Sequence, residues 1–352
     1  MKTNFLRGGK FYKGNLHTHT TRSDGRKSPH DVAREYREHG YDFMAITDHN
    51  IYADFNDFNS GDFLMLPGME INAPPQAGND TEYHFLALPG TREMRDNAPL
   101  PPYGHDFRLE LEPLHTVEYL QPIIDDAVMR GCWVTLNHPY WSRVEYDQVL
   151  SFTNISAIEV YNFCSSALEN TGEAFQCWDA VLRHGVHMLG TSVDDAHHFF
   201  PENSGGYDAF GGYVVAKAES LSLDDITAAL VSGSFYGSAG GPEIYDFYVD
   251  GGRVHFHCSP AARVYFGGRA RHMRWKLADP GGALLTEFVS PLRGDELYVR
   301  AECFDERGGK SFTNPIWLDV PESRKAPVTP SPEQKNREGI GPIRHIYRGC
   351  DK

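Results

Sequence analysis

The chain has 352 residues, of which 40% are hydrophobic, enough for one large domain or for one domain with a small appendage. Its formal net charge of −15 argues against stable nucleic-acid binding, whereas a small anionic substrate remains compatible because bound metal ions would reverse the local charge. The sequence contains no apolar run that could cross a membrane, no stretch typical of a signal peptide and no CxxC pair, so we expect a cytoplasmic protein with reduced thiols.

Residues 14–235 alternate short apolar runs with helical stretches. The first helix is predicted to begin with Ser28 as N-cap and Pro29 at the first helical position, and to end near Gly40. Further helices are predicted over residues 116–130, 168–184 and 223–232. Strands are predicted over residues 14–19, 42–47, 63–71, 83–88, 132–137, 157–162, 186–192 and 212–218. This alternation indicates an α/β architecture in which most strands are parallel.

Two stretches depart from this alternation. Residues 89–115 are rich in proline and charge, and we interpret them as an excursion that could form a lid. After residue 240, period-two alternation between Gly and Pro turns predicts a small antiparallel β-domain. The expected organisation is a main domain over residues 1–235, a β-domain over 236–320, and a loosely packed, Pro- and charge-rich tail over 321–352.

Histidines and carboxylates stand at or near the ends of the predicted strands. In a barrel of parallel strands, the side chains at the carboxyl ends converge on one face, where active sites lie. Residues i and i+2 of an extended strand point to the same side, so His17 and His19 can bind one metal together, as can Asp195 and His197. Glu70 could bridge two metals through its two oxygens. The strand-end residues are His17, His19, Asp48, His49, Glu70, His84, His138, Asp195 and His197.

A structural role is the main alternative for any one of these residues. A lone histidine near a strand end is more often a satisfied structural residue than a ligand. Several such groups together are harder to explain in this way, because burying many ionisable side chains is costly without compensation. Metal ions supply that compensation, and imidazole and carboxylate suit Zn, Mn or Fe. The sequence therefore predicts a metal site.

The same motifs, in order, resemble one known family. The stretches NLHTHTTRSDG, AITDHN, LPGMEI, YHFLAL, LNHP and GTSVDDAH are similar to those of the PHP (polymerase and histidinol phosphatase) superfamily over residues 14–235. The resemblance implies a distorted (β/α)7 TIM-like barrel with two or three divalent metal ions at its C-terminal face. A looser resemblance, in SFYGSAGGPEIYD and FTNPIWLDV, is to the CehA/McbA-type branch, some members of which cleave carboxylic or carbamic esters.

Carried over residue by residue, the PHP resemblance implies three ligand sets. The first is His17, His19, Glu70 and Asp195; the second is Glu70, His84 and His138; the third is Asp24, His49 and His197. The position of Asp24 is histidine in some members. An aspartate there is similar to the amidohydrolase-like and nucleotide-phosphatase branches, which leaves the number of metals at two or three.

Residues next to the ligands are candidates for other roles. Asp48 could orient a ligand or act as a base, beside Glu70 and Asp195 as catalytic groups. Arg22 could clamp a phosphate through two hydrogen bonds, although a surface arginine is the more common outcome. Tyr140 and Arg143 follow His138 at the expected barrel mouth and are predicted to contact substrate. We also expect Asn162 to contact substrate, Glu159 to face inward, Asp194 to support a ligand, and His198 to face solvent.

The implied chemistry is hydrolysis. A water bound by divalent metal ions has its pKa lowered from about 15.7 to about 7, and the resulting hydroxide can attack phosphorus or a carbonyl carbon. The complete ligand set favours a phosphoesterase acting on a small phosphorylated metabolite or nucleotide. The alternative is a carboxylic ester, carbamate or amide hydrolase on the same metals. A non-enzymatic metal-binding module is the third hypothesis, which an intact ligand set disfavours.

Overall fold

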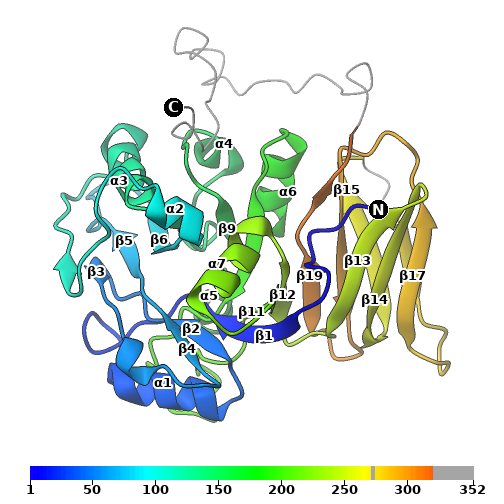
Figure 1. Ribbon diagram of the computed structural model, residues 1–352, viewed down its shortest axis with the longest axis horizontal. Coiled ribbons are helices and arrows are strands. Elements are labelled where there is room, and N and C mark those ends of the chain that lie inside the picture. The colour runs from blue at the N-terminus through cyan, green and yellow to red at the C-terminus, as the bar shows by residue number, and fades with distance from the viewer. Residues whose placement is uncertain (271–273, 320–352) are drawn as a thin grey trace, which may run out of the picture.

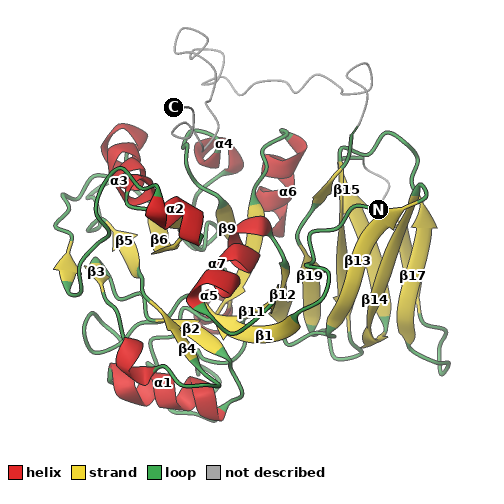
Figure 2. Ribbon diagram, in the orientation of Figure 1, coloured by secondary structure: helices red, strands yellow, loops and turns green. Residues whose placement is uncertain are grey.

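The computed structural model describes residues 1–270 and 274–319. The predicted tail over residues 321–352 lies outside the described residues. Figure 1 shows an α/β region, with β1–β12 and all of the described helices, beside a region of strands that includes β13, β14 and β17. Figure 2 shows that the helices belong to the first region only. None of the described helices is long and apolar enough to span a membrane.

The helices follow the predicted pattern, with some additions. In α1, the side chain of Ser28 accepts a hydrogen bond from the Asp31 backbone N–H, so Ser28 is the N-cap as predicted. Thr116 and Ser222 cap two later helices in the same way. The helices are α1 (Pro29–Glu38), α2 (Arg92–Asp96), α3 (Val117–Met129), α4 (Tyr146–Val149), α5 (Phe163–Glu169), α6 (Phe175–Arg183) and α7 (Leu223–Ser232), with a 3-10 turn at Asn56–Phe58.

The strands of the α/β region form two larger sheets and one small one. Five strands are hydrogen-bonded in the order β10-β9-β8-β6-β5, and β3 pairs with β7. The other sheet contains β4, β2, β1, β11 and β12 at one end. These strands are β1 (Lys10–Asn15), β2 (Phe43–Ala45), β3 (Ile51–Tyr52), β4 (Leu64–Leu66), β5 (Met69–Asn72), β6 (His84–Pro89), β7 (Phe107–Arg108), β8 (Cys132–Leu136), β9 (Ala157–Asn162), β10 (Leu189–Val193), β11 (Tyr213–Ala218) and β12 (Phe235–Ala239).

The strand directions are mixed, and the prediction of mostly parallel strands was wrong. β1, β2 and β4 are parallel, as are β8, β9 and β10. β6 is antiparallel to both β5 and β8, and β11 is antiparallel to β1 and β12. The loop between β5 and β6 contains no helix, and parallel neighbours need a crossover connection that usually contains one. In the described part of the chain the strands form separate sheets and not a closed barrel, so the predicted distorted (β/α)7 TIM-like barrel is not confirmed.

Isolated bridges join the two larger sheets where their strands end. Thr18, beyond β1, pairs with Ala196, beyond β10. His49, beyond β2, pairs with Glu70 of β5. These bridges bring the extensions of four strands to one place. His17, His19, His49, Asp195 and His197 lie on those extensions, and Glu70 lies within β5.

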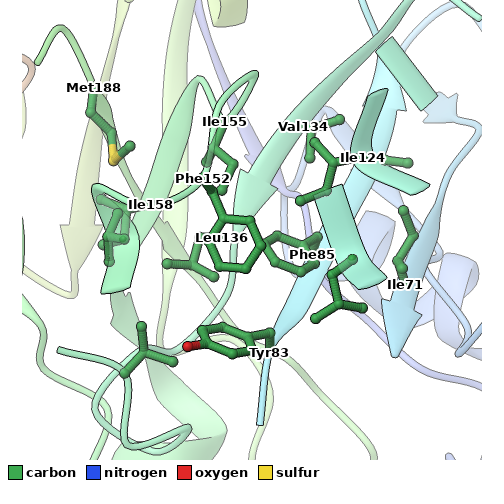
Figure 3. Close-up of a cluster of buried hydrophobic side chains, with 14 of the residues drawn as sticks. Ile71, Tyr83, Phe85, Ile124, Val134, Leu136, Phe152, Ile155, Ile158 and Met188 are labelled. Carbon is green, nitrogen blue, oxygen red and sulfur yellow. The ribbon is translucent and has the colours of Figure 1, made fainter. Parts of the chain in front are cut away.

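The core beneath this place is apolar and closely packed. All residues of β6 and β8 are buried, which fits strands covered on both faces. Figure 3 shows the side chains of Ile71, Phe85, Leu136 and Ile158 from four neighbouring strands, with Ile124 of α3 packed against them. A core packed in this way has little freedom to move, so it holds the strand ends in fixed positions.

The C-terminal strands continue one of these sheets. β12 pairs with β19, and the sheet runs on through β18, β15 and β16, so its hydrogen bonding crosses the predicted boundary at residue 235. A separate three-stranded sheet packs nearby through buried Phe247, Phe256 and Phe266. The remaining strands are β13 (Ile244–Asp250), β14 (Arg253–Ala261), β15 (Arg263–Gly268), β16 (Arg274–Leu277), β17 (Leu285–Pro291), β18 (Tyr298–Phe304), β19 (Lys310–Thr313) and β20 (Ile316–Trp317).

Candidate metal centre

The predicted ligands come from strand extensions that meet at one edge of the two sheets. His17 and His19 follow β1, and His49 follows β2. Glu70 lies within β5, and His84 is the first residue of β6. Because β6 is antiparallel to β8, its first residue lies beside the last residues of β8, and the Asn137 backbone N–H donates to the His84 carbonyl at 3.0 Å. His138 follows β8, and Asp195 and His197 follow β10.

Backbone hydrogen bonds hold the extensions of β1 and β10 together. The Asp195 N–H donates to the His17 carbonyl at 2.9 Å, and the His19 N–H donates to the Ala196 carbonyl at 2.9 Å. Asp194 is fully buried and accepts hydrogen bonds from the N–H groups of residues 210, 211 and 212 and from the Tyr36 hydroxyl. Asp194 therefore anchors the segment that carries Asp195 to the rest of the domain, as its predicted supporting role required.

Glu70 lies at the centre of the cluster. One of its oxygens, Oε1, lies 3.3 Å from His17 Nε2, 3.3 Å from His84 Nδ1 and 3.4 Å from His138 Nε2. The other, Oε2, lies 3.4 Å from His19 Nε2 and 2.9 Å from His49 Nδ1. Both oxygens of one buried carboxylate therefore face imidazole nitrogens, which is the arrangement that a bridging ligand requires.

Asp195 faces the same space from the other side. Its Oδ1 lies 3.1 Å from the Nε2 atoms of both His17 and His19, and its Oδ2 lies 3.8 Å from His138 Nε2. His17 Nε2 and His19 Nε2 are themselves 3.1 Å apart. These atoms bring the residues of the first predicted ligand set together.

Asp24 is the centre of a second group of histidines, beside His19. Its Oδ2 lies 3.5 Å from both His49 Nε2 and His197 Nε2, and its Oδ1 lies 3.7 Å from His19 Nδ1. The Asp24 side chain is 48% exposed, so this group faces solvent. His19 thus lies between the first and third predicted sets. The predicted ligands form three groups whose ligand atoms lie within 4.8 Å of one another: His17, His19 and Glu70; Glu70, His84 and His138; and His19, Asp24, His49 and His197.

Several buried atoms of the cluster make no hydrogen bond. Among the described residues, both ring nitrogens of His84 and Oδ1 of Asp195 are buried without a hydrogen-bond partner. Leaving such groups unsatisfied is costly, and His84 Nδ1 and Asp195 Oδ1 both lie near atoms of other candidate ligands. Lone pairs of imidazoles and carboxylates that converge in this way fit divalent cations such as Zn, Mn or Fe.

The charges of the cluster shift its pKa values strongly. Burial favours neutral His17, but the carboxylates of Asp195, Glu70 and Glu159 outweigh this and hold the pKa of His17 well above its ordinary value. Burial is likewise outweighed at His49, where Glu70 and Asp24 raise the pKa to about 10. Burial, together with His197 and His49, lowers the pKa of His19 to about 4. The imidazoles of the metal-free protein therefore share protons with the carboxylates, and those protons must leave when a cation binds.

Two of the predicted ligands have an unusual backbone conformation. Asp195 has φ of 57° and His138 has φ of 25°, in the left-handed region that residues other than glycine rarely adopt. Conformations of this kind cost about 1–3 kcal/mol each and occur most often at functional sites, where the surrounding structure holds them. His198, with φ of 58°, follows them and is buried, so the expectation that it faces solvent was wrong. Neighbouring residues of an extended strand point to opposite sides, which predicted that His198 would point away from His197 into solvent. The left-handed backbone at His198 breaks this alternation.

Asp48 and Asn162, predicted as a catalytic and a substrate-binding residue, use their side-chain polar atoms in hydrogen bonds to other residues of the protein. Asp48 is fully buried and accepts hydrogen bonds from the Thr20 N–H, the Thr20 hydroxyl and the Ser23 hydroxyl. Asn162 is also fully buried; its amide donates to Glu159 and to Asp195, and its oxygen caps α5. The geometry favours positioning roles for both, and their predicted catalytic and substrate-binding roles stay untested.

The other predicted substrate contacts lie nearer the surface. Tyr140 is 50% exposed, and the Arg143 guanidinium lies 5.5 Å from the centre of its ring. Arg22 forms an ion pair with Asp106, which belongs to the excursion over residues 89–115. That contact links the excursion to the ligand loop, although its predicted action as a lid is not tested.

Three residues near the cluster lacked a sequence motif. Glu82 Oε2 lies 3.6 Å from His84 Nε2, on the side of the ring away from Glu70. Cys164 and Asp208 lie close to His197, with ligand atoms within 4.8 Å of one another. Glu82 could have been found from its i, i+2 spacing to His84. Asp208 could not, because it reaches His197 through a loop whose course the sequence does not reveal.

Comparisons with known proteins give limited results. No protein-family model matches the chain. No curated protein matches it either. A two-domain protein from Bacteroides vulgatus, described as containing a predicted PHP-like metal-dependent phosphoesterase, shares 14% identity at a TM-score of 0.43, with 90% of each chain covered.

Two other solved structures are similar over about half of the chain. One is a proposed metal-dependent phosphoesterase from Bifidobacterium adolescentis, with 15% identity, a TM-score of 0.36, and coverage of 54% of this chain and 90% of the other. The other is an amidohydrolase from Chromobacterium violaceum with bound sulfate and no metal, at 14% identity, a TM-score of 0.36, and coverage of 52% and 87%. Because every one of these TM-scores is below 0.5, the case for function rests on the residues of the cluster.

Proposed function

We propose that this protein is a metal-dependent hydrolase of the PHP type that cleaves a phosphate ester of a small anionic metabolite or nucleotide. The observation that carries the proposal is the position of Glu70. Its two oxygens face five imidazoles, and it belongs to two of the three groups of candidate ligands. A structural salt bridge needs one partner, whereas a carboxylate bridging two cations needs ligands on both sides.

The ligand sets of the proposal are those implied by the sequence. His17, His19, Glu70 and Asp195 would hold one ion, and Glu70, His84 and His138 a second. Asp24, His49 and His197 would hold a third, and His19 lies close enough to share in it. Imidazole and carboxylate serve Mn, Fe and Zn alike, so the identity of the metal is left to experiment. Bound divalent ions would supply Lewis acidity and lower the pKa of a water from about 15.7 to about 7.

The protein's own residues orient these groups and balance their charges. Asp195 and Glu70 face each other across the imidazoles of His17 and His19, so a carboxylate on each side compensates positive charge on the two rings. The hydrogen bonds that Asp48 accepts from residues 20 and 23 fix the loop that carries Asp24. Asp24 is the most exposed of the nine candidate ligands, and it marks the side from which substrate enters.

Phosphate chemistry is preferred because three groups of ligands are present. A phosphate monoester has several oxygens that carry charge, and three cationic centres can hold them, whereas one carbonyl oxygen needs fewer. The PHP-type barrel, the cytoplasmic location and the lid over residues 89–115 belong to the same proposal and await their own tests.

The test is hydrolysis by purified protein loaded with Mn2+, Fe2+ or Zn2+. Phosphomonoesters, phosphodiesters and naphthyl esters would be assayed in parallel, with metal content measured on the same samples. We expect metal-dependent phosphate release that is lost in Glu70→Gln. Turnover of naphthyl esters without phosphate release would replace the phosphoesterase with the carboxylic ester, carbamate or amide alternative. Absence of bound metal after loading would overturn both.

A further inference from the structure

Glu159, in β9, is a fully buried carboxylate placed one layer behind the candidate ligands. Its Oε1 accepts a hydrogen bond from His17 Nδ1 at 2.7 Å. Its Oε2 accepts from the His138 backbone N–H at 2.9 Å and from the Asn162 side-chain amide at 3.0 Å. The same amide donates to Asp195 Oδ2 at 3.0 Å.

In the described part of the chain, no lysine or arginine forms an ion pair with this carboxylate. Among the ion pairs of the described residues, Glu159 takes part only in the one with His17. A buried carboxylate whose one ionic partner is a candidate metal ligand is costly to keep for packing alone, so its presence needs another reason. Glu159 differs in this from Glu173, which is on the surface and pairs with Lys310.

Glu159 also differs from the groups behind the other histidines. His138 Nδ1 lies 3.0 Å from the Ser142 hydroxyl, and His197 Nδ1 lies 2.8 Å from the Asp195 carbonyl. These partners are neutral. Behind His84, Glu82 is more distant and partly exposed. Among the described residues, Glu159 is therefore the one fully buried carboxylate outside the candidate ligands that accepts a hydrogen bond from the imidazole ring of a candidate ligand.

We infer that Glu159 is a positioning residue that sets the tautomer of His17 and couples two metal sites. By accepting the Nδ1–H, it leaves the Nε2 lone pair directed at Glu70 and Asp195, and its negative charge makes that nitrogen a stronger ligand. By accepting the His138 N–H, it fixes the strained turn that presents the second site's imidazole. This inference rests on the proposed metal centre and goes beyond it by naming a residue on which both sites depend.

A conservative variant separates positioning from packing. In Glu159→Gln, shape and hydrogen-bond capacity are kept, but the carboxamide can donate to His17 Nδ1 and so favour the tautomer whose Nε2 carries the proton. We expect metal affinity, measured by competition with a chromophoric chelator and without substrate, to fall about 10- to 100-fold. Glu173→Gln is the matched control and should bind metal as the wild type does. Affinity of Glu159→Gln within twofold of the wild type would overturn the inference.

A second measurement on the wild type protects the test against misfolding of the variant. Nitrogen-15 spectra of histidine-labelled protein saturated with Zn2+ should show His17 protonated at Nδ1, with that signal assigned by its loss in His17→Gln. Protonation at Nε2 would overturn the inference whatever the variant does. Both measurements omit substrate, so a protein that binds metal as described but cleaves no phosphate ester would refute the proposed function alone.

Discussion

Replacing Glu70 by glutamine tests the metal centre most directly. The side chain keeps its size, and its oxygen can still accept the hydrogen bond that Asn137 donates at 2.6 Å. What is lost is the negative charge that faces His17, His49 and His84. Because Glu70 belongs to two groups of candidate ligands, the variant should lose two bound ions and not one.

The size of the effect follows from mass action. Metal present at 100 times its dissociation constant stabilises the folded state by about 2.7 kcal/mol for each site. Two sites therefore amount to roughly 5 kcal/mol, which corresponds to a rise in Tm of roughly 7 °C for a chain of this size. We expect the rise in Tm on adding metal to be smaller by this amount in Glu70→Gln than in the wild type.

The assay is differential scanning fluorimetry with and without added metal, combined with elemental analysis of the dialysed protein. Glu287→Gln is a suitable control, because Glu287 is exposed on β17. The control should shift as the wild type does. If Glu70→Gln retained the wild-type metal content and the same thermal shift, Glu70 would not be a ligand, and the central argument for the site would fail.

Three further predictions concern protons, the Asp48 network and a close backbone contact. The pKa of His49 is raised to about 10, so its contribution to the stability of the metal-free protein is present below pH about 6.5 and is lost as pH rises toward 10. Because His49 is protonated at pH 7.5 and a metal ion displaces that proton, metal binding should release protons, and calorimetric enthalpies that agree between buffers of different ionisation heat would contradict this. Asp48→Ala removes the acceptor of three hydrogen bonds and should lower the free energy of unfolding by about 2–4 kcal/mol in urea titrations, while Asp48→Asn should stay near the wild type. If Asp48→Asn kept its full metal content but lost more than about 100-fold in kcat, Asp48 would instead be the general base. In Gly212→Ala the new Cβ would lie 2.1 Å from the Val193 carbonyl oxygen, so we expect the free energy of unfolding to fall by about 2 kcal/mol or more and metal binding to weaken. Gly205→Ala, with open space around it, should change neither property, and equal stability of the two variants would show that β10 can shift freely.

The sequence predicted the cluster of candidate ligands better than the fold around it. Ligands such as His17 and Asp195 stand directly after apolar runs, and a buried run followed by a polar residue marks a strand end whichever way the strand points. No comparable pattern in the sequence shows whether a strand is parallel or antiparallel to its neighbours. The antiparallel course of β6 follows from its connections, and His84 still reaches the cluster because the first residue of an antiparallel strand lies beside the last residues of its neighbours.

Residues behind the ligands were harder to predict. Period-two alternation places side chains correctly only while the backbone stays extended, and it failed at His198, where φ is positive. Asn162 was expected to contact substrate because it ends a strand on the ligand side, yet its amide is used by Glu159 and Asp195. The contact of Arg22 with Asp106 joins loops distant in sequence, and no local pattern encodes such a meeting.

The continuity of the largest sheet limits how this protein can be divided. β12 has β11 on one side and β19 on the other, and the side chain of Asn314 accepts a hydrogen bond from the Gly190 N–H of β10 at 2.8 Å. A chain cut after β12 would leave the backbone of that strand unpaired along one edge, and exposed edges of this kind pair with other molecules. The region that carries the candidate ligands therefore cannot be separated from the strands that follow it, either by recombination between genes or by truncation in the laboratory.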